Sequence, residues 1–167
     1  SEVNASLEAA TLGARLDPDN AYFRVMQSAC LLAERRDKEG IDALVEAGGC
    51  ARWRTYDAAI VDARYSLVGE IGATFWEWSD VSAGASSGAR AVLRAVARIA
   101  VYAAIKAEKA GDNERGFRLR MALARLASLV RAQGTETMDG FSAGAVLSIA
   151  MTRPGDILEK RFRRGNP

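Results

Sequence analysis

LDPDNAYFRVMQSACLLAERRDKEGIDALVEAGG, residues 16–49, is the stretch of this sequence that decides the fold. Pro18 ends any helix before it, because the residue preceding a proline is pushed out of the helical region. Asp19 or Asn20 can cap the helix that follows, in which apolar residues recur every three or four positions. Asp37 is a good N-cap for a shorter helix, and the final glycine pair stops that helix. The stretch therefore predicts two helices joined by a tight turn.

The rest of the chain continues this helical pattern, and no window has the alternation and β-branched enrichment of a strand. Gly140 and Gly144 are four residues apart, which predicts close contact of their helix with another helix, the alanine-rich one expected over 89–110. The expected helices cover about 3–16, 20–36, 37–47, 55–75, 89–110, 112–133, 138–151 and 156–162, with a Ser- and Gly-rich loop over 79–88. We predict one all-α domain over 1–167, with seven or eight helices packed as antiparallel hairpins around an irregular central segment.

Length and charge exclude several classes of protein. A chain of 167 residues can bury one proper core. Its net charge of +2 is too small to indicate a general nucleic-acid or membrane binder. No apolar run approaches the roughly 20 residues of a transmembrane segment. The chain begins with Ser1 and not with Met, so we expect either a processed chain or a fragment of a longer protein, and localisation and oligomeric state stay open.

The chain has no histidine, and this absence restricts the chemistry available to it. Histidine is the commonest general base and metal ligand near neutral pH, so Ser-His-Asp and Cys-His arrangements are excluded. We expect no metal and no cofactor, because the glycines also lack the lysine of a phosphate-binding P-loop. Cys30 and Cys50 could meet if the helices beside them form a hairpin, but two unpaired thiols are the expectation.

One short pattern matches that of a hydrolase nucleophile. GASSG at 84–88 fits G-x-S-x-G, with Ser86 as the nucleophile. That motif requires a strand before the serine and a histidine to accept its proton, and the sequence offers neither. A serine–lysine pair would need Lys106 or Lys109, more than four turns along the next helix. We interpret the segment as a loop in which Ser86 or Ser87 caps the following helix, and we predict that the chain is not an enzyme.

A second pattern occurs twice. At Asp37 and again at Asp112, a helix ends in a tight turn that contains the aspartate. An acidic residue follows, and then a small residue that starts the next helix. On these residues the stretch 16–47, and less closely 95–131, resembles a tetratricopeptide (TPR) repeat, whose period is 34 residues. Gly40 stands where that family usually has alanine, and the middle of the chain fits no repeat. The resemblance implies helix pairs stacked side by side, with a groove that binds peptides or partner proteins.

A row of cations follows the helix expected over 89–110. The row has one residue at every fourth position. Its cations are Arg90, Arg94, Arg98 and Lys106, and Tyr102 occupies the position before Lys106. Like charges at this spacing repel one another, so the row predicts carboxylates nearby, with Glu70, Glu77 or Asp80 as ion-pair partners. The alternatives are a groove of arginines and one tyrosine that accepts an acidic peptide or another anion, and a plain solvated face.

Tryptophan is concentrated in the middle of the chain, at Trp53, Trp76 and Trp78. Trp76 and Trp78 are two residues apart and cannot share one helical face, so one of them is a candidate for an exposed contact. Alternatively, all three fill the space where the repeat pattern fails. The basic end over 160–167 is interpreted as a solvated terminus or as a patch that docks weakly on anionic lipid or nucleic acid.

These observations favour a non-enzymatic, TPR-like scaffold that binds a protein or peptide, acidic in character, and no specific nucleic acid. Its candidate binding residues are Arg90, Arg94, Arg98, Tyr102, Trp76 and Trp78. One alternative is an enzyme that uses Asp, Glu, Arg and Tyr without histidine or metal, and the other is a surface-associated module that docks through its basic C-terminal end. Converging carboxylates would favour the enzyme, whereas an open groove beside the cation row would favour the binder.

Overall fold

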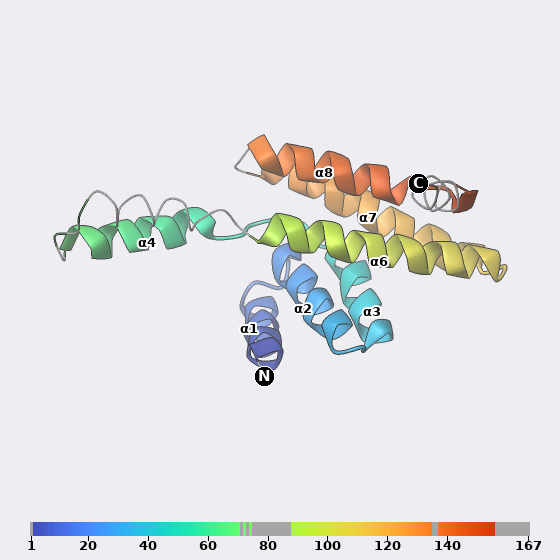
Figure 1. The fold of residues 1–167 in the computed structure, drawn as a ribbon, viewed down its shortest axis with the longest axis horizontal. Coiled ribbons are helices and arrows are strands. Elements are labelled where there is room, and N and C mark those ends of the chain that lie inside the picture. Colours follow the sequence, from blue (N-terminus) through green and yellow to red (C-terminus); the bar gives the residue numbers. More distant parts are fainter. Residues whose placement is uncertain (1, 71, 73, 75–87, 135–136, 156–167) are drawn as a thin grey trace, which may run out of the picture.

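The computed structural model describes residues 2–70, 72, 74, 88–134 and 137–155. This part of the chain forms α1 (Glu2–Leu16), α2 (Ala21–Ala33), α3 (Asp37–Ala47), α4 (Asp57–Glu70), α6 (Ala89–Lys109), α7 (Asn113–Gln133) and α8 (Thr137–Ala150). The described residues contain no strand, and the only bridge among them pairs Asn20 with Arg52. The prediction of an all-α fold is therefore confirmed (Figure 1).

The helices form two layers, and α4 lies outside both. In one layer α2 contacts α1 and α3, and in the other α6, α7 and α8 contact one another. The layers meet where α2 packs on α6 and α3 packs on α7. Figure 1 shows α4 extending away from this body of helices.

The core lies between the two layers, and α6 contributes most of one wall. Ala97, Ala100 and Ala104 are fully buried and recur every three or four residues, so they form one face of α6. Small side chains on this face let the neighbouring helices approach closely. The largest fully buried apolar side chains around it are Leu44, Leu93, Leu123, Leu126, Val25, Val130 and Val146.

Several helix ends follow from capping residues in the sequence. The Asn20 side chain caps α2 by accepting a hydrogen bond from the Tyr22 backbone, and Asp112 caps α7 in the same way through Arg115. Gly111 has a φ of 87°, a conformation that favours glycine, and it makes the tight turn between α6 and α7. The predicted boundaries of α2, α6 and α7 agree with the structure to within about three residues.

The prediction that Asp37 is an N-cap is wrong. Asp37 is the first residue of α3, and the N-cap is Arg36, whose side chain makes no capping hydrogen bond. Asp37 still lies in the first helical turn, where its negative charge is favourable. The residue before α6 is Gly88. Ser86 and Ser87, the predicted caps of this helix, lie outside the described residues, so that prediction is not tested.

The predicted contact of Gly140 and Gly144 with the alanine-rich helix is also wrong. A Cβ atom added to either glycine would meet no atom of the described residues within 4 Å. Helix α8 does contact α6, but it does so through its other face, which buries Ala143 and Val146. The two glycines therefore face open space.

Some predictions concern residues that the structure does not describe. Trp76, Trp78, the GASSG pattern, the last expected helix and the basic end over 160–167 lie outside the described residues. The expected fourth helix is described as α4 over a shorter span. Cys30 and Cys50 are free thiols, as expected.

Candidate functional site

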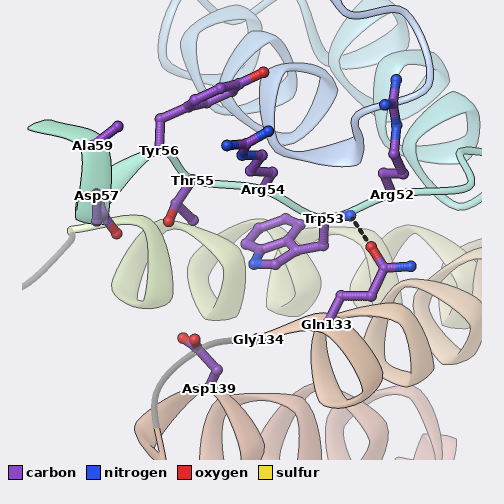
Figure 2. Close-up of a pocket in the computed structure, with 10 residues that line it drawn as sticks. All are labelled: Arg52, Trp53, Arg54, Thr55, Tyr56, Asp57, Ala59, Gln133, Gly134 and Asp139. Carbon is purple, nitrogen blue, oxygen red and sulfur yellow. Dashed lines mark hydrogen bonds between the residues drawn. The ribbon is translucent and has the colours of Figure 1, made fainter.

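The segment 51–56, between α3 and α4, presents its side chains alternately to the two layers. Successive side chains of an extended chain point in opposite directions. Figure 2 shows Arg52, Arg54 and Tyr56 on the side of the first layer. Trp53 and Thr55 point to the other side, toward α6 and α8. One short segment thus supplies groups to two different environments.

Asn20 fixes this segment to the start of α2. Its Oδ1 accepts hydrogen bonds from the backbone N–H groups of Tyr22 at 3.2 Å and Arg54 at 3.0 Å. Its Nδ2 donates to the Arg54 carbonyl at 2.9 Å and to Asp17 Oδ2 at 3.0 Å. Asn20 is fully buried, so all four hydrogen bonds are made without competition from water.

Tyr56 ends the segment in a conformation that is rare for a bulky residue, with a φ of 62°. Three contacts hold it there. Its hydroxyl donates to Asp17 Oδ2 at 2.9 Å, the Arg54 guanidinium lies 4.8 Å from its ring centre, and its ring lies beside that of Phe23. The hydrogen bond to the Asp17 carboxylate raises the pKa of Tyr56, because that bond requires the phenol to keep its proton.

Gln133, the last residue of α7, fixes the same segment to the second layer. Its Oε1 accepts from the Trp53 backbone N–H at 2.9 Å, and its Nε2 donates to the Ala51 carbonyl at 3.0 Å. The Trp53 indole is then buried in the core, with 4% of the residue exposed, edge-on to the Tyr22 ring. Trp53, the first of the three tryptophans noted in the sequence, is thus a core residue.

A cavity of about 360 Å³ lies beside Trp53. Thr55, Asp57 and, from α8, Asp139 contribute side chains to its wall (Figure 2). Asp139 Oδ1 lies 3.4 Å from Nη1 of Arg90, and both side chains are largely buried. The Trp53 Nε1 atom is buried and has no hydrogen-bond acceptor in the described part of the chain. We call this space the Trp53 cavity.

The predicted row of cations does not form one surface. Residues four apart on a helix are offset by about 40°, because each residue turns the helix by 100°. Over the sixteen steps along α6 from Arg90 to Lys106 the row therefore winds almost halfway around the helix. Arg90 is buried beside Asp139, whereas Arg98 is exposed and Arg94 is half-buried. Asp139 was not among the predicted ion-pair partners of this row, and two of those partners, Glu77 and Asp80, lie outside the described residues.

Tyr102 and Lys106 lie on a groove of about 420 Å³ between the two layers. Its apolar lining consists of Leu32, Ile41, Ile99, Ala103, Ala107 and Ala110. Within this lining Ile99 remains 45% exposed, and Tyr102 beside it is 64% exposed. We call this surface the Tyr102 groove.

The rim of the Tyr102 groove carries three cations, Lys38, Lys106 and Arg115, and the carboxylates of Asp37 and Asp112. Lys38 Nζ is paired with Asp42 at 2.8 Å, and this hydrogen bond raises the pKa of Lys38. Lys106 and Arg115 form no ion pair with any residue that the structure describes. Lys106 and Arg115 are therefore the two cations of this rim that have no ion-pair partner among the described residues.

Sequence reasoning identified Tyr102 but missed most of both sites. Asp139 and Gln133 were not singled out, because an aspartate in a first helical turn and a glutamine in a last one are common surface residues. Asp139 is joined to its partner across 49 positions, and Gln133 to its own across 80. The winding of the cation row, in contrast, follows from helix geometry and could have been found from its spacing.

The described residues contain no group of acidic or sulfur side chains placed to hold a metal ion. No helix among them is long and apolar enough to span a membrane. Comparisons of the chain with protein-family models, with curated proteins and with solved structures found no match. The resemblance to TPR repeats thus stays a prediction from the sequence.

Proposed function

We propose that this chain is a non-enzymatic, TPR-like interaction module that binds an acidic peptide segment of a partner protein in the Tyr102 groove. The observation that supports the proposal is the combination of exposed Tyr102 and Ile99 with the unpaired Lys106 and Arg115 at one concave surface.

The apolar part of the groove favours binding by side chains. A volume of about 420 Å³ falls in the range of ligand pockets and would hold two or three side chains of a peptide. Tyrosine supplies a large contact area at a small cost in side-chain entropy, and it is enriched in binding surfaces. The residues that line the groove come from α2, α3, α6 and α7, so the scaffold around it is formed by both layers.

The charges of the rim favour a negatively charged partner. Asp112 is already used as the cap of α7, and Lys38 is already paired with Asp42. Lys106 and Arg115 then offer two unpaired positive charges, while Asp37 contributes one carboxylate to the same rim. Carboxylates of a bound peptide would pair with them, and the complementary charge would speed association at low salt.

The test is the fluorescence anisotropy of a labelled ten-residue peptide of alternating leucine and glutamate. We expect saturable binding that weakens with added salt, and no binding of the same peptide with lysine in place of glutamate. The variant Lys106→Glu/Arg115→Glu should bind at least about tenfold more weakly, because it places like charges opposite each other.

The matched control is Arg94→Glu/Arg98→Glu, which makes the same change of charge on the cation row away from the groove lining. We expect it to bind nearly as well as the unchanged protein. Binding that survives in the Lys106/Arg115 variant and disappears in the Arg94/Arg98 variant would overturn the proposal in favour of the row itself. Equal binding of the acidic and basic peptides would overturn it as well.

A further inference from the structure

We propose that the Trp53 cavity binds a small molecule that carries a primary ammonium group and a carbonyl oxygen, the class to which amino-acid amides and esters belong. This site is separate from the Tyr102 groove, because the two share no lining residue. The inference therefore does not depend on the proposed function.

The first observation is the indole N–H of Trp53. An indole nitrogen can only donate, and a buried donor without a partner lowers the stability of the fold. Trp53 is 4% exposed and lines the cavity, and its Nε1 has no acceptor among the described residues. In Figure 2 the nitrogen lies on the edge of the ring that is turned toward Asp139. A ligand oxygen in the cavity would satisfy this donor.

The second observation is the charge that faces the cavity. Asp57 lines it and forms no ion pair with the described residues, whereas the Asp139 carboxylate is balanced by Arg90. Among the described residues, Asp57 is thus the carboxylate of this wall without an ion-pair partner, and a ligand cation would neutralise it.

The two arginines that also line the cavity do not cancel this charge. The Arg52 guanidinium pairs with Asp17 at 2.6 Å, and that of Arg54 lies over the Tyr56 ring. Both groups point away from the Trp53 side of the segment (Figure 2). Only the backbone of these arginines faces the ligand space.

A ligand that suits the cavity thus needs a cation for Asp57, an acceptor for Trp53 and a modest apolar part for the indole ring. The Thr55 hydroxyl lies on the same side of the segment between these two groups and can donate or accept. The volume of about 360 Å³ admits a molecule of the size of an amino-acid amide.

The experiment is a titration of the ¹⁵N-labelled protein followed by the indole N–H signal of Trp53, which is assigned from the variant Trp53→Phe. Leucinamide is the probe, and we expect it to shift this signal saturably. N-acetyl-leucinamide lacks the charge and should not bind, and 3-methylbutylamine lacks the carbonyl and should bind more weakly, with a smaller indole shift.

The variant Asp57→Asn should weaken leucinamide binding at least about tenfold, as expected for loss of a close charge pair. Asp62→Asn makes the same change on an exposed part of α4 and should bind like the unchanged protein. The inference is overturned if leucinamide causes no saturable shift up to about 10 mM. It is also overturned if the acetylated compound binds equally well or if Asp57→Asn binds with unchanged affinity.

Discussion

Asn20 shows how one side chain determines the path of the chain at two distant points. The sequence predicted it as a helix cap, and one of its four hydrogen bonds is that cap. The other three bind Asp17 and the backbone of Arg54, 34 positions away. Both polar atoms of the amide are therefore required, and a smaller capping residue such as serine could not replace it.

We expect Asn20→Ala to lower the free energy of unfolding by about 3 kcal/mol, because the cap is lost and buried partners of the amide are left unpaired. Urea denaturation measures this change. Asn113→Ala, at an exposed position at the start of α7, is the matched control and should change stability by less than about 0.5 kcal/mol. Equal effects of the two substitutions would show that the Asn20 hydrogen bonds contribute little.

At the scale of the helices, two glycines lie in opposite surroundings, one in a close contact between helices and the other on an open face. A Cβ atom on Gly48, at the end of α3, would lie 2.7 Å from the Cα of Ala122 in α7. The obstacle is backbone, so it cannot move aside cheaply. Gly144, inside α8, has no atom near its missing Cβ. Sequence spacing made Gly144 look like the contact residue, and the structure shows the reverse.

Gly48→Ala should therefore destabilise the protein by about 1–3 kcal/mol through overpacking. Gly144→Ala should stabilise it by about 0.5–1 kcal/mol, because alanine favours a helix interior and nothing obstructs its methyl group. Thermal unfolding of the two variants should shift the midpoint in opposite directions. A stabilising shift for Gly48→Ala would contradict the packing of α3 on α7, and a destabilising shift for Gly144→Ala would contradict the open face of α8.

The helices themselves were largely predictable, because their signals are local. Asn20, Gly111 and Asp112 act within a few residues of their own position, and they set the ends of α2, α6 and α7. The faces that the helices turn to one another were less predictable. Arg90 lies against Asp139 and the two glycines of α8 face open space for reasons that depend on how three helices pack.

At the scale of the whole molecule, two polar side chains join the segment 51–56 to both layers. Asn20 holds it on the side of α2, and Gln133 holds it on the side of α7. Trp53 is thereby inserted into the core at the junction. The candidate cavity beside it could not be predicted from the sequence, since its wall combines residues around 53–57 with Asp139 and exists only once the two layers have met.

The second layer has its own polar junction, formed by Arg120 of α7. Its guanidinium donates to both Glu108 oxygens of α6, at 2.6 Å from Nε and 3.0 Å from Nη2, and Nη1 donates to the backbone carbonyls of Ala150 and Thr152 at the end of α8. The hydrogen bonds that Arg120 donates to Glu108 lower the pKa of Glu108 below its usual 4.5. The ionised form of Glu108 thus stabilises the packing of three helices.

The consequence is a specific dependence of global stability on acid. The pKa of Glu108 is lower in the folded protein than in the unfolded chain. The stabilisation by ionised Glu108 is therefore fully present above the usual pKa of 4.5, and it is lost as the pH falls through the pKa of the folded protein. Glu108→Gln should therefore be less stable than the unchanged protein at pH 7, by about 1 kcal/mol. The difference should shrink below pH 4.5, which urea denaturation at a series of pH values measures. Glu114→Gln removes an exposed carboxylate 4.0 Å from Arg118 and should change little at any pH. A difference for Glu108→Gln that stayed constant down to acid pH would mean that the charge of Glu108 does not contribute to the junction.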